Sequence, residues 1–332
     1  KELGTEPYLP RYGWHKGSVQ LYDESALQKK SENNAEVLGY AKPGDIWKDE
    51  TGKKKAALFI QGKGEDTLAH WSDINQGDLG TCWLLAAISS VARYGRAQAM
   101  FSNITDDGVS VRLCEKDGPY DASKTYFTVN LSTLIPVRKG TDPLQLPFTY
   151  SDEEGEYWPC LAEKAVAACT KYRAVRKPGE KEEDFYGYPG LDGGWTAEGI
   201  GFFIPGLAVM AYKDTFEGGS LFNAWSKLMR TGVTICCQWD TSTQGLVHGH
   251  AYTVLACVEA GGEQLAYFRN PWGSVTTFKY GVWQGKWSAT DKESWSRNPA
   301  TMQACNWHWD KYTRGCFWMA FSDIAANLER VP

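Results

Sequence analysis

Three side chains at widely separated positions could together perform nucleophilic catalysis by a thiol: Cys82, His250 and Asn270. A thiol with the usual pKa of about 8.5 is mostly protonated at neutral pH, so it needs help to attack a carbonyl. A helix start stabilises the thiolate through its unpaired N–H groups, and a neighbouring imidazole accepts the proton. The elements of the fold must therefore place a thiol at a helix start and bring a base to it.

Cys82 opens the run CWLLAAISSVARY (82–94), which is apolar on nearly every face and predicts a buried helix. The turn-forming residues 76–80 precede it, and Thr81 is predicted to be the N-cap, which places Cys82 in the first turn. The other eight cysteines lack this setting and are predicted to be inert buried thiols. Gln76 could bind an oxyanion together with the backbone N–H of Cys82, or it could be a solvated turn residue.

His250 has the setting of a base among the five histidines, because it begins a run of apolar strand-forming residues after Gly249, which leaves room for a close partner. His248 is the competing candidate, two residues away on the same strand face. Asn270 ends the next β-rich run. Its amide oxygen could accept the second N–H of the imidazole and hold the ring, or the residue could simply form a turn before Pro271. The remaining histidines are predicted to be surface or structural residues: His15, His70 and His308.

The elements that would position these residues divide the chain into a helical front half and a strand-rich rear half. Helices are predicted over 82–94, 159–171 and 220–229, and a glycine-rich stretch over 187–206 is interpreted as the connection between the halves. Runs rich in β-forming residues predict four strands, Val233–Trp239, Ala251–Val258, Gln264–Arg269 and Cys316–Phe321.

Composition excludes several classes of protein. Over 332 residues, 35 Lys and Arg balance 40 Asp and Glu, so nothing favours nucleic acid as a partner. The nine cysteines are scattered without a CxxC motif, which favours reduced thiols and a cytoplasmic location. No apolar stretch approaches the roughly 18–20 residues of a membrane-spanning helix. The fifteen tryptophans are interpreted as core and cleft residues, with a sugar-binding platform as the alternative.

Three segments resemble the active-site motifs of the calpain family of cysteine proteases: QGDLGTCWLLAAI (76–88), GHAYTV (249–254) and RNPWG (269–273). Further similarities lie around Glu156, Glu163, 193–199 and 317–323, and all of them occur in the family's order. The resemblance covers about three quarters of the chain, from Asp73 to Asp323.

The resemblance implies an α+β fold of the papain-like type, in which a cleft separates a helical subdomain, 67–203, from a β-rich subdomain, 204–332. Residues 1–66 are predicted to be an irregular N-terminal extension. By carry-over, Cys82, His250 and Asn270 would form the catalytic triad, and Gln76 would complete the oxyanion hole. Trp272 would cover the histidine and asparagine, although an ordinary core tryptophan is the alternative.

Calcium is the cofactor that the resemblance implies, acting through one core site or not at all, and no organic cofactor is expected. The two acidic ligands of the family's first site fall on Asp73 and Glu156, which could equally be surface carboxylates. The positions of the second site's carboxylates carry other residues, so that site is predicted to be lost. Those positions are Val282, Ala289, Arg314 and Cys316, and the family's Arg–Glu pair between the halves falls on Trp71 and Cys316.

The sequence thus predicts a calpain-like cysteine endopeptidase acting on protein or peptide substrates through an acyl-thioenzyme. A catalytically silent binding or regulatory module is the alternative, favoured by the lost calcium ligands and opposed by the complete triad. Oligomeric state and cleavage preference cannot be derived from these residues.

Overall fold

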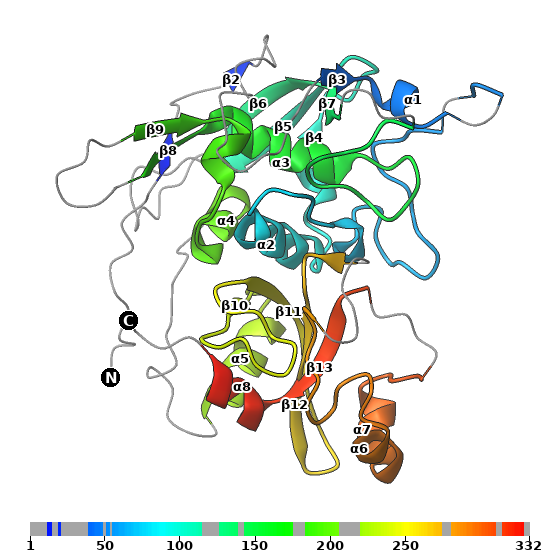
Figure 1. The fold of residues 1–332 in the computed structure, drawn as a ribbon, viewed down its shortest axis with the longest axis vertical. Coiled ribbons are helices and arrows are strands. Elements are labelled where there is room, and N and C mark those ends of the chain that lie inside the picture. The colour runs from blue at the N-terminus through cyan, green and yellow to red at the C-terminus, as the bar shows by residue number, and fades with distance from the viewer. Residues whose placement is uncertain are drawn as a thin grey trace. The chain divides into compact units, whose positions relative to one another are not determined.

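The computed structural model describes residues 12–14, 19–20, 39–48, 51–53, 55–114, 126–138, 143–174, 183–205, 220–273, 280–309 and 314–328. These residues form two compact units, an N-terminal unit within 7–208 and a C-terminal unit within 209–332. Each unit combines helices with mainly antiparallel sheets, which confirms the α+β class (Figure 1).

The N-terminal unit is built around α2, the helix that begins at Cys82. Its other elements are β1 (Tyr12–Trp14), β2 (Val19–Gln20), β3 (Gly39–Ala41), α1 (Pro43–Ile46), η2 (Trp71–Asp73), η3 (Gln98–Met100), β4 (Phe101–Ser102), β5 (Gly108–Cys114), β6 (Tyr126–Ser132), β7 (Ile135–Val137), α3 (Trp158–Cys169), β8 (Thr170–Ala174), β9 (Glu183–Tyr186), η4 (Tyr188–Leu191) and α4 (Thr196–Phe203). Helix α2 runs over Cys82–Ala92, and every residue after Cys82 is buried, as its apolar sequence predicts.

Helix α4 packs closely against α2, and this contact explains part of the glycine-rich stretch. A Cβ atom on Gly199 would lie 2.7 Å from Cβ of Ala87 and 3.0 Å from the carbonyl oxygen of Trp83. Only glycine allows the two helices to approach this closely. Residues 188–203 therefore belong to the body of the N-terminal unit, and their interpretation as a connection between two halves is wrong.

Sheets form a larger part of the N-terminal unit than the sequence predicts. Strands β2, β6, β5 and β4 make one sheet, β1, β8 and β9 a second, and β3 and β7 a third. In β6, Phe127, Val129 and Leu131 are buried while the residues between them are more exposed. This alternation with period two is a strand signal, so the description of residues 67–203 as a helical half is incomplete.

Parts of the predicted N-terminal extension are joined to this unit by backbone pairing. Strand β1 pairs with β8, β2 pairs with β6, and β3 pairs with β7. The described strands of residues 1–66 are thus edge strands of sheets whose other strands lie more than 80 residues further along the chain.

The C-terminal unit contains one antiparallel sheet in the order β10-β11-β12-β13. Its elements are α5 (Ser220–Arg230), β10 (Cys236–Gln238), β11 (Ala251–Ala260), β12 (Glu263–Arg269), α6 (Lys292–Arg297), α7 (Pro299–Ala304), β13 (Cys316–Ala320) and α8 (Phe321–Asn327). The four predicted strands and the predicted helix over 220–229 are confirmed, with ends that differ by a few residues.

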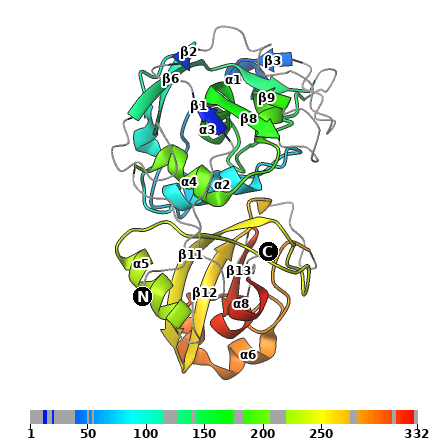
Figure 2. The ribbon, with the colours of Figure 1, turned by 90° about the vertical axis from the view of Figure 1, so that its left-hand side faces the viewer.

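Two separate apolar cores cover the two faces of this sheet. Helices α5 and α8 lie beside the sheet (Figure 2). Phe317 and Met319 of β13 pack into the core that contains residues of α5 and α8, whereas Trp318 and Ala320 pack into the other. The second core contains a tryptophan cluster made of Trp287, Trp295, Trp307 and Trp318. These tryptophans are buried, so they serve the core rather than a sugar-binding platform.

The eight cysteines whose side chains are described form no disulfide, as the scattered spacing predicts. Among the described helices, none combines the length and apolar character needed to cross a bilayer.

Candidate active site

The turn before Cys82 is held by close backbone approaches that only glycines permit. A Cβ atom on Gly77 would lie 2.4 Å from the carbonyl oxygens of Pro147 and Phe148. The N–H of Gly80 donates to Oδ1 of Asp192 at 3.0 Å, and a Cβ atom there would lie 2.3 Å from the same oxygen. This turn therefore delivers Cys82, whose side chain is partly exposed, to the first position of α2.

Thr81 occupies the N-cap position but does not cap the helix with its side chain. Its hydroxyl instead donates to Oε1 of the fully buried Glu163 at 2.8 Å, while Oε2 of Glu163 accepts from the N–H of Thr149 at 3.1 Å. Burial raises the pKa of Glu163. The prediction of a threonine side-chain cap is wrong, because a buried carboxyl group is a stronger hydrogen-bond acceptor for this hydroxyl.

Gln76 lies on the same turn, with its side-chain amide fixed in orientation. Its Nε2 donates to the carbonyl oxygen of Leu79 at 2.8 Å, and its buried Oε1 has no hydrogen-bond partner among the described residues. An amide nitrogen carries two hydrogens, so Nε2 can donate a second hydrogen bond.

The C-terminal unit brings His250, Asn270 and Trp272 together. His250 directly precedes β11, and Asn270 directly follows the neighbouring strand β12. Nε2 of His250 lies 2.8 Å from Oδ1 of Asn270, and both side chains are buried. The position of Gly249 has a φ of 65°, so the glycine is required by the left-handed backbone rather than by a close partner.

Two further hydrogen bonds determine which way the amide of Asn270 points. Its Nδ2 donates to the carbonyl oxygen of Gly281 at 2.6 Å, and its Oδ1 also accepts from the N–H of Trp272 at 2.9 Å. Oδ1 must therefore accept from Nε2 of His250, which leaves the lone pair of a neutral ring on Nδ1. Burial lowers the pKa of His250 to about 4, against the opposing effect of the Asn270 hydrogen bond, so the ring is neutral at pH 7.

Aromatic rings enclose this imidazole. The ring of Trp272 lies 4.4 Å from that of His250 at an angle of 34°, and Tyr252 meets His250 edge-on at 5.0 Å. Tyr280 stacks against Trp272, with the ring centroids 5.5 Å apart. The alternative candidate His248 is exposed and has no such enclosure, although its backbone N–H donates to Oγ of Ser242.

The predicted calcium ligands Asp73 and Glu156 are both fully buried, which excludes the alternative that they are surface carboxylates. Burial raises the pKa of both carboxyl groups, and the negative charges of Glu156 and Glu65 raise that of Asp73 further. Oδ1 of Asp73 has no hydrogen-bond partner in the described structure. Mutually repelling carboxylates with an unsatisfied oxygen fit a cation.

The second calcium site is predicted to be lost, and the residues at its positions lie in surroundings that do not suit a cation. Val282 and Cys316 are buried in apolar surroundings, and Arg314 occupies a turn with a φ of 44°. None of these side chains offers the carboxylate oxygen that Ca²⁺ needs.

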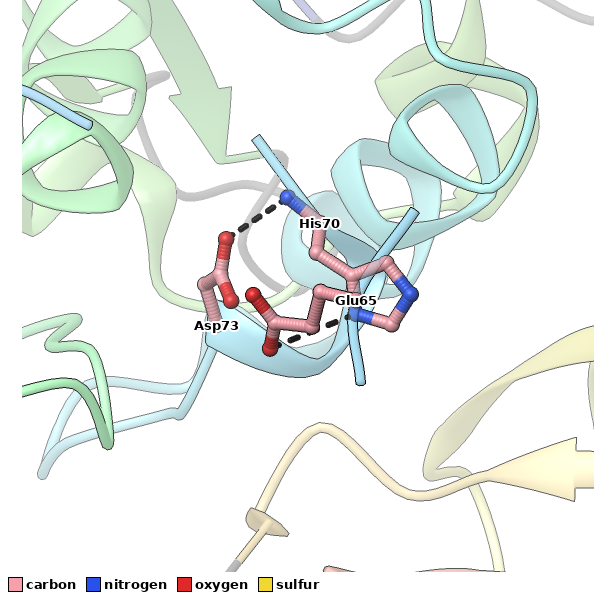
Figure 3. Close-up of side chains that lie close together, drawn as sticks. All are labelled: Glu65, His70 and Asp73. Atoms are coloured by element: carbon pink, nitrogen blue, oxygen red, sulfur yellow. Dashed lines mark hydrogen bonds and ion pairs between the residues drawn. The ribbon is translucent and has the colours of Figure 1, made fainter. Parts of the chain in front are cut away.

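Several partners of the candidate residues have no signal in the local sequence. The carbonyl of Gly281 and the carboxyl group of Glu163 are contributed by distant segments. His70, predicted to be a surface or structural histidine, is buried beside Glu65 and Asp73 (Figure 3). The His70 side chain caps η2, and its place three residues before Asp73 in the motif HWSD is the sequence signal that could have predicted this position.

A thiol at the start of a buried helix and an imidazole held by a carboxamide are the reactive groups of a cysteine protease. The sequence model of the calpain family of cysteine proteases matches residues 20–332. The chain belongs to the calpain family.

Individual calpains are similar over most of this chain. Calpain-8 of Rattus norvegicus is 30% identical over 303 residues, which cover 87% of this chain and 38% of the relative. Calpain-9 of Homo sapiens is 30% identical over 86% of this chain and 39% of its own length. Calpain clp-4 of Caenorhabditis elegans is 29% identical over 78% of this chain and 34% of its own length. The chain thus spans between about a third and two fifths of the length of these relatives.

Proposed function

We propose that this chain is the catalytic core of a calpain-type cysteine endopeptidase that hydrolyses peptide bonds in proteins or peptides. The observation that carries the proposal is the hydrogen-bonded arrangement of His250 and Asn270. It fixes the tautomer of the imidazole and leaves the lone pair on Nδ1, as a general base requires.

In this mechanism Nδ1 of His250 accepts the proton of the Cys82 thiol, and the resulting thiolate attacks the carbonyl carbon of the scissile bond. The tetrahedral intermediate collapses to a thioester as the amine leaves with the proton from His250. A water molecule then gives its proton to His250, attacks the thioester and releases the acid product and the thiolate. Asn270 keeps the ring oriented throughout.

Gln76 and Trp272 support these steps. The second hydrogen on Nε2 of Gln76 and the N–H of Cys82 would donate to the oxyanion, at about 3–4 kcal/mol for each donor. Trp272 covers the imidazole and excludes water from the His250–Asn270 bond.

The mechanism requires a papain-like arrangement, in which subdomain 67–203 carries the nucleophile, subdomain 204–332 carries the base, and substrate binds in a cleft between them. Burial lowers the pKa of His250 to about 4, so the ring is neutral at pH 7 and its Nδ1 can accept the proton of the thiol.

Calcium is a second part of the proposal, at one core site with Asp73 and Glu156 as ligands. Bound Ca²⁺ would supply positive charge to a buried group of carboxylates and so stabilise the segment that leads to Cys82. The reduced thiols support a location in the cytoplasm, where glutathione keeps cysteines reduced.

A catalytically silent regulatory module remains the second candidate, because the carboxylates of the second calcium site are replaced. The two candidates differ in the reactivity of Cys82. A thiol-reactive probe such as iodoacetamide would label an activated Cys82 much faster than an ordinary thiol.

Cleavage of casein by the purified chain, with and without Ca²⁺, tests the proposal. We expect cleavage by the parent chain and none by Cys82→Ala or His250→Ala. Cys114→Ala, which removes a buried thiol at the end of β5, is the matched control and should retain activity. Equal cleavage by the parent and by Cys82→Ala would refute the mechanism.

A further inference from the structure

Thr81 is bonded directly to Cys82, and each of its polar groups has a partner. Its N–H donates to the carbonyl oxygen of Leu79 at 2.7 Å. Its carbonyl oxygen accepts from the N–H of Leu85 at 2.9 Å, a helical hydrogen bond that begins α2. Its hydroxyl donates to Oε1 of Glu163 at 2.8 Å. The side chain that precedes the thiol is therefore tied to α3, a helix from a distant part of the chain.

Glu163 joins two segments through its two carboxyl oxygens. While Oε1 accepts from the hydroxyl of Thr81, Oε2 accepts from the N–H of Thr149 at 3.1 Å. The segment around Thr149 lies against the turn before Cys82, since the N–H of Asp78 donates to the carbonyl oxygen of Pro147 at 2.9 Å. The carboxyl group of Glu163 thus bridges the start of α2 and the segment that supports the turn.

Packing alone does not favour a carboxyl group at position 163. Glu163 and Thr81 are each 1% exposed, and burying a carboxyl group is unfavourable compared with burying an apolar side chain of similar volume. Burial raises the pKa of Glu163, and the hydrogen bonds from Thr149 and Thr81 oppose this rise. What the carboxyl group provides in return is a directional bond to the residue that precedes the thiol.

The residues on either side of Thr81 have anchors that do not involve Glu163. The N–H of Gly80 donates to Oδ1 of Asp192 at 3.0 Å, and Nε1 of Trp83 donates to the carbonyl oxygen of Leu191 at 2.9 Å. We therefore expect loss of the Thr81 hydroxyl to displace the start of α2 locally without unfolding the turn or the helix.

We propose that Glu163 is a positioning residue for the Cys82 nucleophile and acts through the hydroxyl of Thr81. This role rests on the proposed function, in which Cys82 attacks the scissile bond. The N–H groups at a helix start stabilise a thiolate only where the sulfur lies within their reach. By holding Thr81, Glu163 fixes the backbone that carries both the sulfur and the N–H of Cys82, which would donate to the oxyanion.

The rate at which iodoacetamide alkylates Cys82 in the folded chain tests the proposal without a substrate. Mass spectrometry of the peptide that contains Cys82 measures this rate separately from the reactions of other partly exposed thiols. Thr81→Val keeps the branched shape but removes the hydroxyl, so it should slow alkylation at pH 7 by about threefold or more and raise the pKa of the thiol. Thr81→Ser keeps the hydroxyl and should retain the parent rate.

Glu163→Leu removes the other partner of the same hydrogen bond and should slow alkylation to a similar extent. The double variant Thr81→Val/Glu163→Leu should be no slower than either single variant, because the bond can be lost only once. It should also be more stable than Glu163→Leu, since it leaves no buried hydroxyl without an acceptor. A double variant that alkylates at the parent rate would show that Glu163 serves the fold alone and would overturn the proposal.

Thr133→Val is the matched control, because Thr133 is 2% exposed in the same unit and its hydroxyl donates to the carbonyl oxygen of Asp106 at 2.7 Å. This variant should lose stability but alkylate at the parent rate. Equal rates in the parent and Thr81→Val, or equal slowing in Thr81→Val and Thr133→Val, would overturn the proposal.

Cleavage of casein by the same proteins separates this role from the proposed function. In an active parent, kcat should fall by about 10-fold in Thr81→Val with little change in KM. A parent that cleaves nothing while Thr81→Val still slows alkylation would refute the protease activity and support the positioning role. An active parent whose cleavage and alkylation are both unchanged by Thr81→Val would do the reverse.

Discussion

The two units hold their candidate catalytic residues by different means. In the C-terminal unit, side-chain hydrogen bonds fix His250 and Asn270, and each polar atom of the Asn270 amide has a partner. In the N-terminal unit, the backbone positions Cys82, through a turn whose glycines fit against carbonyl oxygens and a carboxylate.

The difference follows from the chemistry that each group performs. An imidazole must be held in one tautomer and one ring orientation, which requires directional hydrogen bonds. A thiol at a helix start needs only the correct backbone position, because the N–H groups and dipole of the helix stabilise its thiolate. We therefore expect substitutions of neighbouring side chains to disturb His250. We expect substitutions that crowd the backbone of the turn to disturb Cys82.

The largest expected effect is that of Asn270→Ala on catalysis. Loss of the amide removes the acceptor for Nε2 of His250, so the ring can rotate and change tautomer, and kcat should fall by about 100-fold or more with little change in KM. Steady-state cleavage of a fluorogenic peptide measures this. Asn298→Ala, which removes an amide that bonds only to Ser294 in the described structure, is the control and should behave like the parent. An equal loss in both variants would mean that Asn270 only supports the fold.

The pH dependence of unfolding should reveal the buried imidazole. His250 has a pKa of about 4 in the folded protein against about 6.5 when unfolded, so between these values the unfolded chain binds the extra proton. The contribution of His250 to the free energy of unfolding is then complete above pH 6.5 and falls by roughly 3 kcal/mol as the pH drops to 4.

Urea unfolding of Cys82→Ala at several pH values measures this dependence. His250→Gln in the same background should flatten the dependence, whereas His308→Gln, at an exposed position, should leave it intact. If His250→Gln retained the full slope between pH 6.5 and 4, the imidazole would not be the buried group that titrates.

A smaller effect is expected from Gly77→Ala, which tests the backbone side of the comparison. The new Cβ would meet two carbonyl oxygens at 2.4 Å, so the turn must shift at a cost of about 1–3 kcal/mol. Activity should fall because Gln76 and Cys82 move, while the pH dependence due to His250 stays. Gly39→Ala is the control, since its nearest neighbour would be a methyl group at 4.0 Å. Equal stability of the two variants would show that the turn accommodates a Cβ atom at position 77 without strain.

The sequence predicted those parts of the fold whose signals are local. The helix at Cys82 and the four strands of the C-terminal unit follow from continuous apolar runs, and the structure confirms them. The sheet of β5 and β6 was missed because the strand predictions followed continuous apolar runs, whereas β6 alternates apolar with polar residues.

For the candidate site, the sequence proposes residues but does not predict their contacts. Thr81 has the residue type of a helix cap, yet its hydroxyl bonds to Glu163, which lies 82 residues further along the chain. The carboxylate partners of His70 lie close in sequence, but Asp73 also accepts a hydrogen bond from Trp158 of α3, 85 residues further along the chain. Such pairings depend on tertiary packing, which local patterns do not encode.

Asn270 is followed by Pro271, and this neighbour affects the chemical stability of the Asn270 side chain toward deamidation. Asparagine usually deamidates when the next backbone nitrogen attacks the side-chain carbonyl to form a five-membered ring. Proline has no N–H to lose in that step, and the amide of Asn270 is buried with all of its polar atoms hydrogen-bonded. The group that orients the imidazole is thereby protected from slow chemical conversion to aspartate, a change that would place a negative charge beside His250.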